Sequence, residues 1–230
     1  MKLSVIICVY NERESILEIV ERTQSVSLGD GWERELVIVD NCSHDGTREI
    51  LRGLAAPNLR VIYQPRNMGK GTSVRTGFAH CTGDYGFIQD ADREYDPAEQ
   101  PRFLARATAD NLDAVYGSRT LGGQRVYIYA VNYWAVRGLT LLTNALFGAH
   151  YTDVATASKL VRTSVFRALH LNCSGFDLDF ELSNKLARGR YRVGEIAISY
   201  QPRSRAEGKK IRAADGFRAL WVILRDRLRP

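Results

Sequence analysis

Short apolar runs rich in β-branched residues recur through the first half of the chain. They cover residues 3–10, 36–40, 59–63, 85–88 and 114–116. Unbroken runs of this length are typical of strands buried on both faces of a parallel sheet. Helical spacing follows the first run, at Ile16, Leu17, Ile19 and Val20, and returns after later ones. The alternation predicts an α/β fold with a mainly parallel central sheet flanked by helices.

Polar residues stand at or just after the ends of four of these runs. They are Asn11 and Glu12, Asp40, Asn67 and Lys70, and Asp90 and Asp92. In open α/β sheets, ligands bind at the carboxyl ends of the strands. One acidic strand end is commonly a cap, but four polar strand ends in succession indicate a ligand site.

The fourth strand end carries two carboxylates one residue apart, Asp90 and Asp92, with Glu94 two residues further on. Such oxygen ligands can converge on one hard divalent cation, Mg²⁺ or Mn²⁺, and a nucleoside diphosphate would complete the shell. Spacing alone leaves a solvated acidic turn open as the alternative. Pro97 then begins a helical pattern, as proline does in a first turn.

Composition and motifs exclude several other classes. The four cysteines are far apart and form no CxxC pair, which indicates reduced thiols in a cytosolic protein and no zinc site. The P-loop and GxGxxG patterns are absent. The net charge of +6 suggests an anionic partner, but the dispersed basic residues match no nucleic-acid reader, so we expect no nucleic acid. We see no signal peptide and no apolar run of spanning length.

The second half of the chain changes character. Residues 126–147 are apolar but carry isolated polar groups, and we expect a helix that lies against the domain. A further helix is expected to continue to Arg188, and a strand over 191–200. The last helix, 213–227, combines Phe217 and Trp221 with several arginines. It suits either a membrane interface or packing on the domain, and both remain open.

Several stretches together resemble one known family. They are VYNE at 9–12, NMGKG at 67–71, DAD at 90–92 with YDP at 95–97, GSR at 117–119, TD at 152–153 and EGKKI at 207–211. The chain resembles the family 2 glycosyltransferases and, within them, the polyprenyl-phosphate (dolichol-phosphate) mannosyltransferase group. The match covers nearly the whole chain.

The resemblance implies a GT-A (nucleotide-diphospho-sugar transferase) fold in a single domain, 1–230. Residues 1–119 would form the nucleotide-sugar-binding half, 120–211 the acceptor-side half and 212–230 a C-terminal amphipathic helix. It also implies a divalent cation and an inverting transfer of a hexose. Mannose is the expected hexose, from a GDP-mannose-like donor. The acceptor would be a polyprenyl phosphate, and the protein would be cytoplasmic, held peripherally at the inner face of the cell membrane.

The resemblance also assigns roles by position. The catalytic residues would be Asp92, Asp90 and Arg119, and the metal ligands Asp90, Asp92 and Glu94. The nucleotide-binding residues would be Tyr10, Asn11, Glu12, Asp40, Asn67, Lys70, Ala91, Arg203 and Lys209. The acceptor phosphate would be bound by Arg119 and Arg137.

Alternative functions follow from the same residues. The donor could be UDP-glucose or another nucleotide sugar, and the acceptor a soluble or glycan hydroxyl. A lipid phosphate is already ionised near neutral pH, whereas a hydroxyl needs a carboxylate base, for which Asp177 and Asp179 are candidates. A nucleotide-sugar-binding domain without turnover is the remaining alternative.

Three positions depart from the family pattern. Cys8 stands where the family often has proline. Glu94 replaces a common glutamine, which adds charge near the aspartate pair. Ala155 lacks the acidic side chain that close relatives often carry, and this leaves the acceptor or sugar open rather than the fold.

Overall fold

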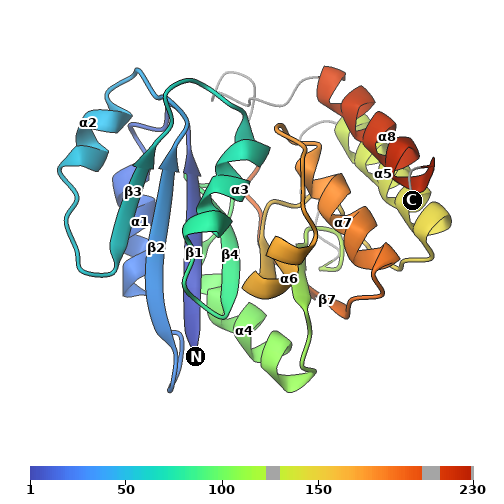
Figure 1. Cartoon of the computed structure of the whole chain (residues 1–230), viewed down its shortest axis with the longest axis horizontal. Coiled ribbons are helices and arrows are strands. Elements are labelled where there is room, and N and C mark those ends of the chain that lie inside the picture. Colours follow the sequence, from blue (N-terminus) through green and yellow to red (C-terminus); the bar gives the residue numbers. More distant parts are fainter. Residues whose placement is uncertain (123–129, 204–212, 229–230) are drawn as a thin grey trace.

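The computed structural model describes residues 1–122, 130–203 and 213–228. Its centre is a sheet of seven strands in the order β3-β2-β1-β4-β6-β5-β7 (Figure 1). The strands are β1 (Lys2–Val9), β2 (Glu33–Asp40), β3 (Leu59–Tyr63), β4 (Tyr85–Asp90), β5 (Ala114–Ser118), β6 (Lys159–Arg162) and β7 (Val193–Ala197). Strand β6 runs antiparallel to both neighbours, and the other pairs are parallel. The prediction of an α/β fold with a mainly parallel sheet is confirmed.

Helices cover both faces of this sheet (Figure 1). They are α1 (Ile16–Ser25), α2 (Thr47–Arg52), α3 (Lys70–His80), α4 (Gln100–Ala109), α5 (Ala130–Phe147), α6 (Thr163–Ala168), α7 (Leu178–Arg188) and α8 (Ala213–Leu228), with the 3₁₀ turn η1 (Pro97–Glu99) before α4. The expected strand over 191–200 is shorter than predicted, because only Val193–Ala197 pairs with β5. The helix expected over 126–147 is described from Ala130, since residues 126–129 lie outside the described part.

The side-chain alternation along β1 divides the core into two layers. Ile6 faces a layer that contains Val74 and Phe78 of α3. Val5 and Ile7 face the opposite layer, against residues of α1 and α4. All three β1 side chains are fully buried, so the sheet is covered on both sides, as continuous apolar strands require.

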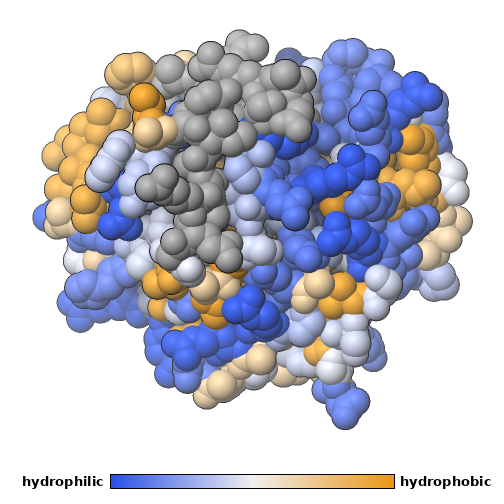
Figure 2. Space-filling model, turned by 180° about the vertical axis from the view of Figure 1, so that it is seen from behind, coloured by the Kyte–Doolittle hydropathy of each residue, from blue (hydrophilic) through white to orange (hydrophobic). Residues whose placement is uncertain are grey.

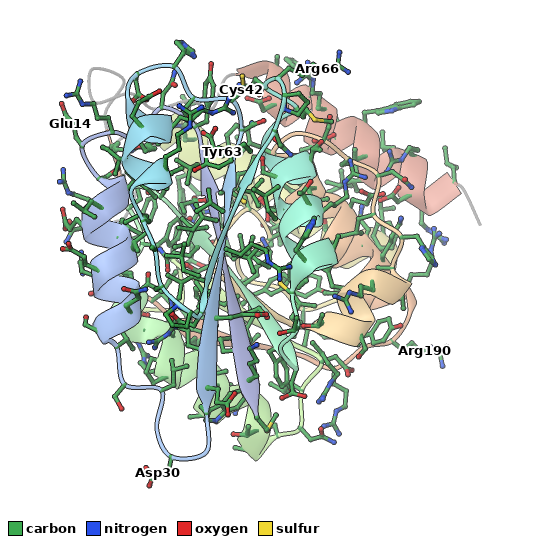
Figure 3. The ribbon with its side chains drawn as sticks, turned by 60° about the vertical axis from the view of Figure 1, so that its left-hand side comes forward. Glu14, Asp30, Cys42, Tyr63, Arg66 and Arg190 are labelled. Atoms are coloured by element: carbon green, nitrogen blue, oxygen red, sulfur yellow. The ribbon has the colours of Figure 1, made fainter. Side chains whose placement is uncertain are left out.

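Strand β1 lies where the strand order reverses, between β2 and β4. In open α/β sheets, this switch point at the carboxyl ends of the strands is where ligands bind. Cys42 and Arg66 lie toward that end of the sheet and Asp30 lies at the opposite end (Figure 3). The topology therefore places the loops after β1, β2 and β4 around one site.

Helix α8 packs against α5 and α7 at one side of the molecule (Figure 1). Its Ala219, Val222 and Ile223 are buried in that contact, which confirms the packing expected as one alternative for the last helix. Phe217 and Trp221 instead point outward, 75% and 64% exposed. No helix in the described ranges is long and apolar enough to cross a membrane.

Candidate functional site

A cavity of about 750 Å³ opens at the carboxyl ends of β1 and β4. Predicted site residues on its wall are Tyr10, Glu12, Asn67, Lys70, Asp90, Ala91, Asp92, Glu94, Arg119 and Arg203. Cys8 and Asp90 are neighbours across the pairing of β1 with β4, so the parallel register brings the two strand ends together. The prediction that the polar strand ends meet at one edge is confirmed for these residues.

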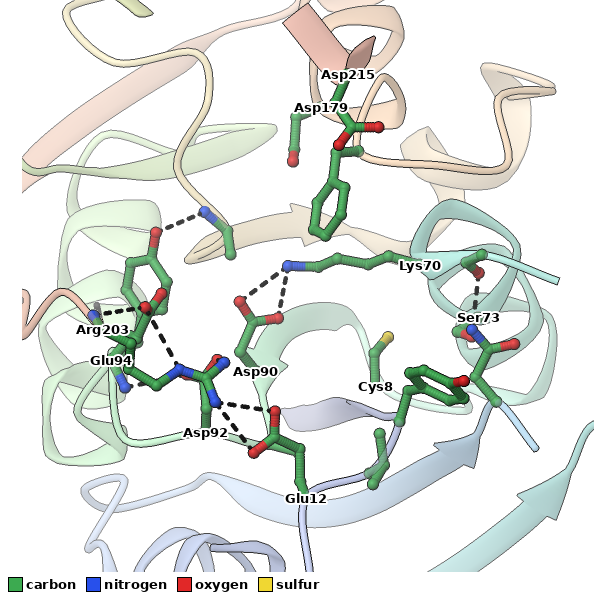
Figure 4. A pocket seen from close by; sticks show the side chains of 18 of the residues that line it. Cys8, Glu12, Lys70, Ser73, Asp90, Asp92, Glu94, Asp179, Arg203 and Asp215 are labelled. Carbon is green, nitrogen blue, oxygen red and sulfur yellow. Dashed lines mark hydrogen bonds and ion pairs between the residues drawn. The ribbon is translucent and has the colours of Figure 1, made fainter. Parts of the chain in front are cut away.

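Arg203 joins three acidic side chains in this wall (Figure 4). Its guanidinium is 3.1 Å from Glu12 and 3.5 Å from Glu94, and it donates a hydrogen bond to Asp92. These carboxylates come from two strand-end loops that are far apart in sequence. Arg203 therefore ties the end of the β7 segment to the site around β1 and β4.

Lys70 crosses the cavity from the first turn of α3 to Asp90 (Figure 4). Its ammonium nitrogen lies 2.6 Å from Oδ1 and 2.9 Å from Oδ2 of Asp90. Burial alone would lower the pKa of Lys70, but the negative charge of Asp90 and of Asp179 outweighs it and raises the pKa. Lys70 therefore stays charged beside this carboxylate.

Asp92 provides a test of whether the site suits a cation. Burial first, and the neighbouring charge of Asp90 second, raise the pKa of the Asp92 carboxyl to about 7. Two close carboxylates on a cavity wall form an oxygen donor set suited to Mg²⁺ or Mn²⁺. Asp90 and Asp92 therefore fit the expected cation.

Glu94, the third predicted metal ligand, has protein partners for both of its carboxylate oxygens. Its Oε1 accepts a hydrogen bond from the backbone N–H of Arg203 at 2.9 Å, and its Oε2 accepts one from the Tyr200 hydroxyl at 2.9 Å. Both oxygens thus face the 200–203 segment. In the described ranges, no three acidic, histidine or cysteine side chains form a group suited to a metal ion.

Arg119, at the end of β5, is held by Asp153. Its backbone N–H, Nε and Nη2 lie 3.1, 2.7 and 2.8 Å from the carboxylate oxygens of Asp153. The guanidinium also lies over the Tyr200 ring and 3.3 Å from the Tyr95 hydroxyl. This side chain is 7% exposed yet borders the cavity, so it presents a fixed positive charge there.

A second lysine–aspartate pair lies across the cavity from Asp90. Lys159 is fully buried, and its Nζ lies 2.6 Å from Oδ1 of Asp179 on α7. Burial lowers the pKa of Lys159, although Asp179 opposes this shift. Cys8, beside Asp90, also lines the cavity, and burial raises the pKa of its thiol to about 12, so the thiol stays protonated at neutral pH.

Two predicted nucleotide-binding residues support the neighbouring loops and do not line this cavity. Asp40 is fully buried and accepts hydrogen bonds from the Ser43 N–H and from Arg48 Nε. Asn11 has a φ of 51° and accepts a hydrogen bond from the N–H of His44. Both side chains tie neighbouring loops together, and their role in binding the nucleotide stays a prediction.

Arg137 and Lys209 are the two remaining basic residues with a predicted role in ligand binding. Arg137 on α5 does not line the cavity. Its Nη1 donates a hydrogen bond to the backbone carbonyl of Thr152 at 3.3 Å. Its expected contact with an acceptor phosphate is therefore not supported by this geometry. Lys209 lies outside the described residues.

Several residues at the site carried no role in the sequence interpretation. Asn41 lines the cavity and accepts a hydrogen bond from the Met68 N–H at 2.7 Å. Tyr95 and Tyr200 are also in the lining. Asp153 belongs to the TD stretch, and this motif was the sequence feature that pointed to it. The motif does not indicate that Arg119 is its partner.

Comparison with known proteins agrees with this geometry. A sequence model described as glycosyl transferase family 2 matches residues 4–169. An undecaprenyl-phosphate 4-deoxy-4-formamido-L-arabinose transferase of Edwardsiella ictaluri is 33% identical, over 90% of this chain and 62% of its own length. A dolichol-phosphate mannosyltransferase of Pyrococcus furiosus is 28% identical, over 91% of this chain and 59% of its own. The chain thus spans about three fifths of the length of these curated relatives.

Solved structures show the same fold at low identity. Glucosyl-3-phosphoglycerate synthase from Mycobacterium tuberculosis aligns with a TM-score of 0.71 at 21% identity, over 100% of this chain and 81% of the other. Mannosyl-3-phosphoglycerate synthase from Rubrobacter xylanophilus aligns with a TM-score of 0.73 at 15% identity, over 98% and 72%. The expected GT-A fold is confirmed.

Proposed function

The chain belongs to glycosyl transferase family 2, and on that premise we propose that it transfers a hexose from a nucleotide sugar to a polyprenyl phosphate. One observation carries the proposal: the aspartate pair shares a single cavity with four cationic side chains, Lys70, Arg119, Arg203 and Arg218. That arrangement suits two phosphate-bearing ligands. The carboxylates supply a cation site, and the cations attract the phosphates.

On the donor side, Asp90 and Asp92 would hold a divalent cation, which supplies positive charge to the diphosphate as the glycosidic bond breaks. A structural neighbour was crystallised with Mn²⁺, UDP and phosphoglyceric acid, at a TM-score of 0.69. Asn67 and Tyr10 on the same wall would face the nucleoside. Lys70 and Arg203 add positive potential beside the diphosphate.

On the acceptor side, an ionised phosphate oxygen would attack the anomeric carbon from the face opposite the leaving group, which inverts the configuration. Such an acceptor needs no strong base. The two candidate bases already have partners, because Asp179 accepts from Lys159 and Asp177 accepts from the Gly175 N–H at 2.9 Å. Of these two, Asp179 lines the cavity and Asp177 does not, so Asp179 is the base that a hydroxyl acceptor would need.

The names of the relatives support the acceptor more than the sugar. Both the undecaprenyl-phosphate and the dolichol-phosphate enzyme are named for a polyprenyl phosphate, whereas one is named for a modified arabinose and the other for mannose. We propose mannose, from GDP-mannose, as the first donor to test. The arabinose derivative and UDP-glucose follow.

An apolar surface supports peripheral membrane association on the cytoplasmic side. The exposed side chains are Val131, Trp134 and Leu141 of α5 and Phe217, Trp221, Leu224 and Leu228 of α8. Figure 2 shows apolar residues gathered at the edge of the molecule where these helices lie. Arg227 of α8 is exposed as well. An apolar helix face with nearby arginines suits an anionic lipid surface.

A donor and acceptor screen tests the proposal. Release of nucleoside diphosphate is measured with GDP-mannose, UDP-glucose and the arabinose donor, with farnesyl phosphate or with soluble sugars as acceptor. We expect release that requires the lipid phosphate. Release with soluble sugars alone would contradict the acceptor, and nucleotide binding without release under every condition would favour a non-catalytic domain.

A further inference from the structure

Asp153, which orients Arg119, lies in an irregular segment. The segment connects α5 to β6 and has no helix or strand of its own between residues 148 and 158. Yet the Asp153 side chain is fully buried and makes three contacts with Arg119. A segment of this kind needs outside contacts to hold one conformation.

Glu195 provides those contacts from strand β7. Its two carboxylate oxygens lie 3.0 and 2.9 Å from the backbone nitrogen of Thr152, and Oε1 lies 3.3 Å from that of Asp153. Burial raises the pKa of Glu195, and the hydrogen bonds from Thr152 and Asp153 oppose that shift. The Glu195 carboxylate thus accepts hydrogen bonds from the backbone N–H groups of Thr152 and Asp153.

Strand pairing fixes Glu195 relative to Arg119. Strand β7 runs parallel to β5, with Glu195 opposite Tyr116, three residues before Arg119. The cavity lining does not include Glu195. The hydrogen bonds that link Glu195 to the cavity run through the Thr152–Asp153 backbone to Arg119.

We infer that Glu195 is a positioning residue: it fixes Thr152 and Asp153, and Asp153 then sets the direction in which Arg119 presents its guanidinium to a phosphate. The inference rests on the proposed function for the identity of that phosphate. It concerns a glutamate outside the cavity, to which neither the sequence motifs nor the family resemblance gave a role.

A double-mutant cycle tests the inference. Glu195→Gln, Arg119→Lys and the double variant are compared by kcat/KM for farnesyl phosphate. We expect Glu195→Gln to lower this value by up to about 100-fold, as small misplacements of site groups can, and the double variant to match Arg119→Lys alone. Effects that multiply in the double variant, or an unchanged Glu195→Gln, would overturn the inference. Glu33→Gln, an exposed glutamate at the start of β2, is the matched control.

A second measurement does not depend on turnover. In ¹⁵N-labelled protein, the Nε–H signal of Arg119 is assigned by its loss in Arg119→Lys. We expect Glu195→Gln to shift that signal and speed its exchange with water, and Glu33→Gln to leave it unchanged. If no transfer occurs but the signal responds, the proposed function fails and the positioning of Arg119 stands. If transfer occurs and the signal does not respond, the inference alone fails.

Discussion

The ammonium of Lys70 lies 2.6 and 2.9 Å from the two carboxylate oxygens of Asp90, one of the two residues that fit a divalent cation. Lysine and cation would therefore share one carboxylate. Unit charges about 4 Å apart interact by about 4 kcal/mol at an effective dielectric constant near 20. For a cation to bind, Lys70 must therefore move away from Asp90, or the negative charge of the diphosphate must offset the repulsion between the cation and Lys70.

Replacing Lys70 is expected to expose this competition. Lys70→Met should tighten Mn²⁺ binding in the absence of nucleotide by at least about tenfold, because the competing charge is removed. Electron paramagnetic resonance of free Mn²⁺ measures the affinity. Lys2→Met, at the opposite end of the sheet, should leave it unchanged. Equal or weaker binding by Lys70→Met would show that the two cations do not compete.

The first turn of α3 is expected to tolerate no added side chain at Gly71. A Cβ there would lie 2.8 Å from the carbonyl oxygens of Cys173 and Gly175. Gly71→Ala should therefore destabilise the protein by about 1–3 kcal/mol and weaken nucleotide binding, because the adjacent Lys70 moves with the turn. Urea unfolding and nucleotide titration measure the two effects.

Gly138 in α5 provides the control for this prediction, since a Cβ there has no neighbour within 4 Å. Gly138→Ala should raise the free energy of unfolding by about 0.5–1 kcal/mol, the usual gain in helix propensity. If Gly71→Ala behaved like Gly138→Ala, the close approach of α3 to the 173–175 turn would be wrong.

Glu35 predicts a pH dependence of stability. Burial alone would raise its pKa, but hydrogen bonds from Ser4, Thr82 and Lys2 outweigh burial and lower the pKa to about 2. A lowered folded-state pKa stabilises the protein above the unfolded value near 4.5, and this stabilisation is lost as the pH falls toward 2. Glu35→Gln should therefore cost about 1–3 kcal/mol at pH 7 and much less near pH 2. A cost that is equal at both pH values would contradict the pKa assignment, and exposed Glu33→Gln is the control.

The apolar surface on α5 and α8 predicts binding to lipid vesicles. Trp134 is 70% and Trp221 is 64% exposed, so replacing both with Gln should reduce sedimentation with anionic vesicles about tenfold or more, since each large apolar side chain contributes roughly 1.5–3 kcal/mol on burial. The melting temperature should stay nearly constant. Leu17→Gln, at an exposed leucine of α1, is the control. Unchanged vesicle binding by the double variant would show that this surface does not bind the membrane.

Sequence reasoning found the fold and the strand-end residues because both follow from local patterns. Continuous apolar runs identify buried strands, and parallel strands bring their polar ends to one edge, where Asp90 and Glu12 line the same cavity. The side-chain contacts between these residues could not be predicted from local patterns. Arg119 and Asp153 are 34 residues apart, and Glu94 and Tyr200 are 106 apart.

Glu94 shows why. Spacing suggested a third metal ligand, but the return of the chain after β7 places Tyr200 and Arg203 against that carboxylate. The partner of Asp40 was equally out of reach, because Arg48 on α2 donates a hydrogen bond to its carboxylate. Polar side chains at a strand end can support loops or bind ligands, and only the tertiary contacts distinguish the two.

We propose that a sugar moves onto a lipid phosphate while a cation held by the aspartate pair would stabilise the leaving diphosphate. The most direct test follows radiolabel from GDP-mannose, and from the other donors, into organic-extractable farnesyl or undecaprenyl phosphate with Mg²⁺ present. We expect label in the organic phase with the unmodified protein. Asp92→Ala should transfer at least about 100-fold less, since metal stabilisation supplies several kcal/mol. Label only in water-soluble products, or full transfer by a folded Asp92→Ala protein, would contradict the account.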